Sequence, residues 1–127
     1  MGNGTSIGRV RGLGSAHSGA HHWLLQRFTA VGNLLLSMWL VVSLILLPDL
    51  GYETVSQWIA KPLPATAMAL LIVSTFWHAR LGLQVVIEDY VHDAGNKFAA
   101  IVALNLVAFA GAAFGLFCVA RLALGAN

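Results

Sequence analysis

WHARLGLQVVIEDYVH, residues 77–92, places a histidine, His78, deep inside an apolar segment and an Asp89-Tyr90 pair where that segment meets water. On an α-helix with about 3.6 residues per turn, the eleven steps from His78 to Asp89 come to roughly 1,100°, close to three full turns. The two side chains therefore share one face of the helix, roughly 16 Å apart along its axis. An ionisable residue inside a membrane span is costly and marks a candidate functional site.

The composition is that of a membrane protein. Of the 127 residues, 58% are hydrophobic and 9% are charged, and the mean hydropathy is +0.78. Soluble domains carry about 25% charged residues. The seven Lys and Arg are scattered, so a pI of about 9.1 does not indicate a nucleic-acid partner. The basic residues are expected instead to orient the chain in a bilayer. The single cysteine, Cys118, provides neither a disulfide framework nor a zinc site.

Three apolar spans follow a polar start of the chain. They cover about residues 28–47, 63–87 and 98–120, and each reaches the roughly 20 residues needed to cross a ~30 Å hydrocarbon core. Helices are the only open-chain structure that satisfies its backbone in lipid. We therefore predict an all-α membrane protein, with a polar N-terminal arm over residues 1–22 and a domain of three transmembrane helices with short connections over residues 23–127.

The basic residues predict an orientation. Arg9, Arg11 and Arg27 precede or begin the first span, whereas Lys61 is the only basic residue in the connection that follows it. Under the positive-inside rule the N-terminus lies inside and the C-terminus outside.

His78 is the residue that points most strongly to chemistry. An imidazole in a helical bundle suits haem iron as an axial ligand, and Ser74 and Gly82, one turn to either side, are small enough to leave clearance for a flat macrocycle. Close helix packing explains the same two residues, and a structural histidine bonded to a neighbouring helix is the alternative for His78. Because the chain has only this one deep histidine, a second axial ligand has to come from another subunit.

The inner end of the same helix carries a second polar group. The Tyr90 hydroxyl is able to donate to a quinone carbonyl, and the Asp89 carboxylate to orient it or relay protons. Arg27, with His21 or His22, lies on the same side of the membrane and is a candidate for neutralising haem propionates. Taken singly, these residues are also typical of an interfacial tyrosine, a helix-ending acid and a positive-inside arginine.

Other polar or small residues in the spans suggest contacts between helices. Arg80 lies about 200° around the helix from His78 and has to snorkel or face a partner. Asn33 and Asn105 are predicted to form interhelical hydrogen bonds. Gly111 and Gly115 form a small-xxx-small packing face.

Three motifs together resemble those of a known family. They are HAxxG at residues 78–82, EDYVH at 88–92 and GAHHWxxxRxTA at 19–30. The pattern, in a chain with three spans, is similar to the small hydrophobic membrane-anchor subunit of succinate dehydrogenase, respiratory complex II, over about residues 19–122.

The resemblance implies specific roles. His78 would ligate haem b, with the larger cytochrome b anchor subunit giving the other ligand. Tyr90, assisted by Asp89, would bind ubiquinone near the iron–sulfur subunit, and Arg27 would lie near the propionates. Flavin and clusters would belong to the flavoprotein and iron–sulfur subunits. The expected location is a bacterial inner (cytoplasmic) membrane, in preference to a mitochondrial one.

Two other functions fit the same residues. One is a haem-free anchor of the fumarate reductase type, in which His78 is structural. The other is an unrelated small transporter or assembly subunit, in which His78 and Asp89 form a proton path through the membrane.

Overall fold

The computed structural model describes residues 19–125 and contains four helices in that range. They are α2 (Gly19–Ile45), α3 (Tyr52–Ile59), α4 (Pro62–Tyr90) and α5 (Ala94–Ala123). The helices α2, α4 and α5 are long and apolar enough to cross a membrane. The predicted fold class, an all-α protein with three transmembrane helices, is therefore confirmed.

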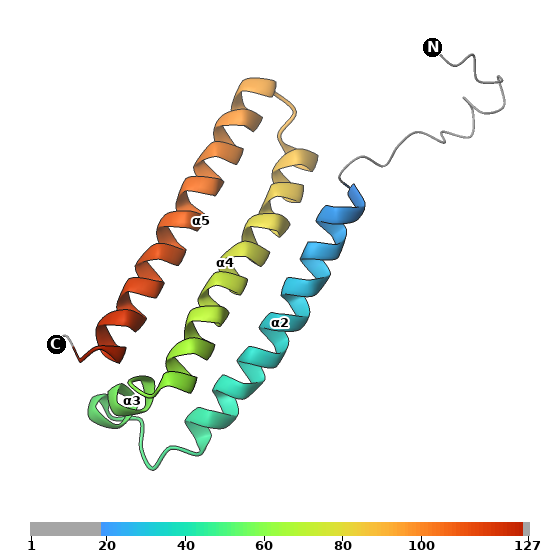
Figure 1. Cartoon of the computed structure of the whole chain (residues 1–127). Helices are drawn as coiled ribbons and strands as arrows, with labels where there is room; N and C mark the ends of the chain where they lie inside the picture. Colours follow the sequence, from blue (N-terminus) through green and yellow to red (C-terminus); the bar gives the residue numbers. More distant parts are fainter. Residues whose placement is uncertain (1–18, 126–127) are drawn as a thin grey trace, which may run out of the picture.

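The three long helices lie side by side in a single layer with α4 in the middle (Figure 1). The helix α4 contacts α2 on one side and α5 on the other, and α2 does not touch α5. Such a layer has almost no interior: Ile59, Leu81 and Val119 are the only buried hydrophobic residues of the described chain. Large apolar side chains are exposed along all three spans, so lipid or other subunits have to cover both faces.

The helices extend beyond the predicted apolar spans at every end but one, since α2 ends at Ile45, two residues before the predicted end of the first span. The first begins at Gly19 rather than near residue 28, so residues 19–22 of the predicted polar arm are helical. Similarly, α4 continues to Tyr90 and α5 begins at Ala94. The apolar pattern marks only the part of a helix inside the hydrocarbon core, whereas the helix continues through the interfacial layer. Residues 1–18 of the predicted arm lie outside the described residues.

A short helix, α3, occupies the first connection, which the sequence prediction described only as short. The Asp49 side chain stabilises the turn that leads into α3. It accepts hydrogen bonds from the Gly51 amide (2.7 Å) and the Thr54 hydroxyl (2.9 Å). Trp58 stacks on Trp39 of α2 with ring centroids 5.7 Å apart, and Ile59 is buried. The helix thereby closes one end of the layer (Figure 1).

The other end of the layer, which we call the Tyr90 end, gathers the start of α2, the end of α4 and the start of α5 (Figure 1). Asp93 caps α5 by accepting a hydrogen bond from the Asn96 amide at 2.8 Å. The Lys97 ammonium donates to the Glu88 carbonyl at 3.1 Å and ties α5 to α4. This end thus carries polar residues from all three spans. Its assignment to the inner side of the membrane stays a prediction.

Glycines bring α5 close to α4, as predicted. A methyl group at Gly111 would overlap the Phe76 ring of α4, and one at Gly115 would lie 3.0 Å from Ile72. The two glycines let the helix backbones approach closely, which is the usual way that helices pack in lipid.

Replacing Gly111 with alanine should therefore lower the thermal stability of the detergent-solubilised protein. The added methyl overlaps the Phe76 ring, and overpacking of this kind costs about 1–3 kcal/mol. Gly19→Ala is the matched control, because a methyl there meets nothing within 4 Å. Equal melting temperatures for the two variants would contradict the close packing of Gly111 against Phe76.

Candidate functional site

His78 lies half-buried where α4 packs on α2. Its Nδ1 atom is 3.1 Å from the Thr29 hydroxyl oxygen of α2. The same hydroxyl lies 2.9 Å from the Leu25 carbonyl oxygen and 3.1 Å from that of Gln26, within its own helix. The contact therefore runs from the backbone of α2, through a threonine, to the imidazole of α4.

The second ring nitrogen of His78, Nε2, makes no hydrogen bond with any residue in the range 19–125. No buried side-chain nitrogen or oxygen in that range lacks a partner. Within the described chain, Nε2 therefore reaches the surface of the layer, where it is open to a ligand that this part of the chain does not supply.

The two small residues that flank His78 have different surroundings. Ser74 donates to the Thr29 carbonyl at 3.3 Å, and its hydroxyl lies against Gly32, where a methyl would be 3.5 Å away. Ser74 thus has a packing role between α2 and α4. At Gly82 a methyl would meet nothing within 4 Å, so the space on that side of His78 is open.

Arg80 faces the opposite side of α4 from His78. Its Nε donates to the Asn105 side-chain oxygen of α5, and its guanidinium lies over the Trp77 ring, 5.8 Å from the centroid. Two residues correspond to about 200° of helix rotation, which is why a middle helix presents His78 to one neighbour and Arg80 to the other. Asn33 accepts from Thr75 at 3.4 Å, so both predicted asparagine contacts are confirmed.

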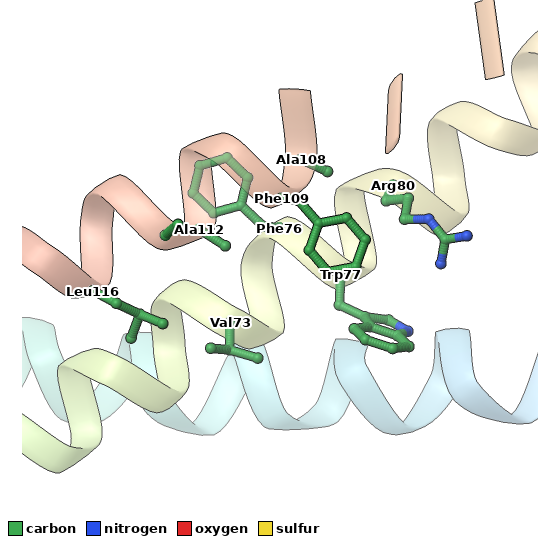
Figure 2. A pocket seen from close by; sticks show the side chains of 9 residues that line it. Val73, Phe76, Trp77, Arg80, Ala108, Phe109, Ala112 and Leu116 are labelled. Atoms are coloured by element: carbon green, nitrogen blue, oxygen red, sulfur yellow. The ribbon is translucent and has the colours of Figure 1, made fainter. Parts of the chain in front are cut away.

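An apolar groove of about 260 Å³ runs between α4 and α5. Figure 2 shows Val73, Phe76 and Leu116 along it, with the Arg80 guanidinium reaching beyond the apolar side chains. Arg80 is the only charged residue in its lining. A surface of this kind suits acyl chains or another helix and offers little to a polar substrate.

The remaining candidate residues lie at the Tyr90 end and are not joined to one another. Tyr90 is 78% exposed, and Asp89 is also exposed. Arg27 lies over the Trp23 ring, 5.4 Å from its centroid. No hydrogen bond or ion pair in the described chain links Arg27, His21 or His22 to Asp89 or Tyr90. Within the described chain these residues therefore do not form one connected cluster.

The donor set fits haem better than a metal ion held by protein alone. Residues 19–125 contain no group of three or more His, Cys, Asp or Glu side chains able to hold a metal ion. What they offer is the imidazole of His78, with one nitrogen bonded to a neighbouring helix and the other open. Haem needs only one such imidazole from a given chain. The porphyrin supplies four nitrogen ligands, and a second protein ligand completes the coordination of the iron.

Comparison with known proteins decides the family. Residues 1–112 match the family described as the succinate dehydrogenase/fumarate reductase transmembrane subunit. The chain belongs to this family. This confirms the resemblance seen in the motifs and rules out an unrelated transporter.

Individual relatives narrow the assignment. The succinate dehydrogenase hydrophobic membrane anchor subunit of Rickettsia conorii is 37% identical, over 85% of this chain and 91% of the relative. The protein of the same name from Paracoccus denitrificans is 31% identical, over 92% and 90%. The succinate dehydrogenase membrane anchor subunit of Reclinomonas americana is 30% identical, over 72% and 78%. These relatives place the chain among the succinate dehydrogenase membrane anchors.

Sequence reasoning assigned no role to Thr29, although it is the residue that contacts His78. Thr29 lies 49 residues before His78, so no local spacing connects them. Its place in the GAHHWxxxRxTA motif, two residues after Arg27, was the only sequence signal.

Proposed function

We propose that the chain is the hydrophobic anchor of a succinate:quinone oxidoreductase, in which it supplies one axial ligand of haem b and part of the ubiquinone-reduction site. The observation that supports the proposal is the hydrogen bonding of the His78 ring: Nδ1 is bonded to Thr29, and Nε2 is open at the surface of the layer. A histidine with a purely structural role would use its polar atoms within the bundle.

In this proposal His78 binds the iron through Nε2, and the larger cytochrome b anchor provides the second ligand. A haem bound there would supply one-electron redox chemistry. The open space beside Gly82 leaves room for a flat ring system. Ser74 serves helix packing instead, because its hydroxyl is used by the Thr29 carbonyl.

The quinone headgroup binds at the Tyr90 end. The Tyr90 hydroxyl donates a hydrogen bond to one quinone carbonyl, and the Asp89 carboxylate orients the hydroxyl or passes a proton to the reduced quinone. Both side chains are exposed in the isolated chain, which suits a site that is completed by the iron–sulfur subunit. Exclusion of water by that protein strengthens the hydrogen bond.

Basic groups at the start of α2 neutralise the haem propionates. Arg27 is the main candidate, because the residue is exposed and the one interaction of its guanidinium within residues 19–125 is with the Trp23 ring. His21, which is exposed, and His22, which is half-buried, lie on the first turns of the same helix. The charge bias of the sequence favours the inner side of the membrane for these residues, and the Rickettsia and Paracoccus relatives support a bacterial inner membrane.

The proposed partners are those that the family resemblance implies, and the exposed faces of the layer support the need for them. A single layer with so few buried residues needs the larger cytochrome b anchor and lipid on its faces, and the iron–sulfur and flavoprotein subunits at the Tyr90 end. The family also includes fumarate reductase subunits, so a haem-free anchor of that type is the competing function.

Purification of the tagged chain from its own membranes tests the proposed function. We expect a flavoprotein, an iron–sulfur protein and a second hydrophobic protein to co-purify with it. We also expect the preparation to reduce ubiquinone with electrons from succinate. Recovery of the same subunits with quinol-dependent fumarate reduction and no haem would establish the competing function. Recovery of the chain without any succinate-oxidising subunit would overturn both.

A further inference from the structure

We propose that Thr29 is a positioning residue that fixes the protonation pattern and ring orientation of His78, so that Nε2 presents its lone pair to the iron. The proposal rests on haem ligation by His78, as set out above. It concerns a residue that touches neither haem nor quinone and acts only through the imidazole.

The hydrogen bonds available to the Thr29 hydroxyl determine which nitrogen of His78 carries the proton. A threonine hydroxyl has one proton to donate and lone pairs to accept with. The Leu25 carbonyl, at 2.9 Å, is closer to the hydroxyl than Nδ1 is, at 3.1 Å, and a carbonyl is only able to accept. When the hydroxyl donates to Leu25, it has to accept from His78, so the proton of the neutral imidazole lies on Nδ1.

The opposite arrangement makes fewer hydrogen bonds. If the hydroxyl donated to Nδ1, its bond to the Leu25 carbonyl would be lost, and the ring proton would lie on Nε2, which has no partner in residues 19–125. Unpaired donors are strongly disfavoured in an apolar medium. The arrangement with the proton on Nδ1 satisfies both groups and leaves Nε2 free as a metal ligand.

Thr29 is also held firmly enough to orient the ring. Its side chain is branched at Cβ, and bonding of the hydroxyl to the preceding turn selects one rotamer. Its own carbonyl accepts a hydrogen bond from Ser74, one turn before His78 on α4. The side chain and the main chain of Thr29 therefore both contact α4 beside the imidazole.

An acceptor on the far nitrogen changes the properties of a metal-bound histidine. It fixes the ring orientation and makes the imidazole a stronger donor to the metal, and loss of such a partner costs roughly 10–100-fold in metal affinity or activity. A stronger donor stabilises oxidised iron. Removal of the Thr29 hydroxyl should therefore raise the haem midpoint potential and speed the loss of haem.

Thr29→Val in the intact complex is the test, because valine keeps the shape and removes the hydroxyl. We expect the haem midpoint potential to rise and the transfer of haem to an excess of a haem-scavenging apoprotein to become about tenfold faster or more. Thr29→Ser should restore both properties. Thr75→Val is the matched control: it removes a hydroxyl from the same interface, where it bonds Asn33, and should leave both properties unchanged.

Several results would overturn the role of Thr29. One is an assembled Thr29→Val complex with the wild-type potential and haem retention, and another is an equal effect of Thr29→Val and Thr75→Val. If Thr29→Val and Thr29→Ala both failed to assemble while Thr75→Val assembled, Thr29 would be a packing residue. A wild-type complex without haem would instead overturn the proposed function on which this inference rests.

Discussion

Replacing His78 with alanine should abolish the haem spectrum of the purified complex, or reduce haem content to a small fraction of wild type. The substitution removes the imidazole that the described chain places between α4 and α2, and an axial ligand fixes both haem binding and redox potential. Assembly should survive in part, because α5 packs on α4 through Gly111 and Gly115, away from His78. Haem per complex is measured by the reduced-minus-oxidised visible spectrum and checked by extraction.

His92→Ala is the control for this substitution. His92 is exposed in the connection that follows α4, and its loss should leave haem content unchanged. Full haem content with an unaltered spectrum in an assembled His78→Ala complex would show that His78 is structural. That result would remove His78 as a haem ligand.

Tyr90→Phe should lower the rate of quinone reduction by roughly tenfold or more. The ring remains, but one donor to the quinone carbonyl is lost. A neutral hydrogen bond contributes about 0.5–1.5 kcal/mol, and an acceptor left unpaired costs about 1–3 kcal/mol. About 1.4 kcal/mol corresponds to a factor of ten in rate. Haem content, and electron transfer from succinate to an artificial acceptor at the soluble subunits, should stay near wild type.

The chain offers a matched control, because it has two tyrosines. Tyr52 begins α3 at the opposite end of the layer, so Tyr52→Phe should leave quinone kinetics unchanged. If Tyr90 were only an interfacial anchor, Tyr90→Phe would affect assembly and spare the quinone kinetics. Unchanged quinone reduction in a fully assembled Tyr90→Phe complex would therefore refute the proposed role.

The sequence predicted those parts of the fold that depend on the bilayer. Span lengths follow from its thickness and helical structure from its lack of water, and both predictions hold for α2, α4 and α5. The face of Gly111 and Gly115 was predictable because small residues pack helices in lipid. The helix α3 was missed because only eight residues form it and its contacts, such as Trp58 with Trp39, are distant in sequence.

The arrangement of the helices was not predictable in the same way. Lipid and helix interiors are equally apolar, so hydropathy does not show which face of a span meets another helix. Asn33 and Asn105 were recognised as hydrogen-bonding residues, but their partners, Thr75 and Arg80, are set by the order of helices in the layer. His78 was identified by the cost of a polar side chain in a span, whereas its partner Thr29 emerged only from the packing of α2 on α4.

The haem content of the wild-type complex, purified through a tag on this chain, tests haem ligation by His78 most directly. We predict a low-spin b-type reduced-minus-oxidised spectrum, with one haem per copy of the chain. An assembled complex that oxidises succinate and reduces ubiquinone without any haem would contradict it.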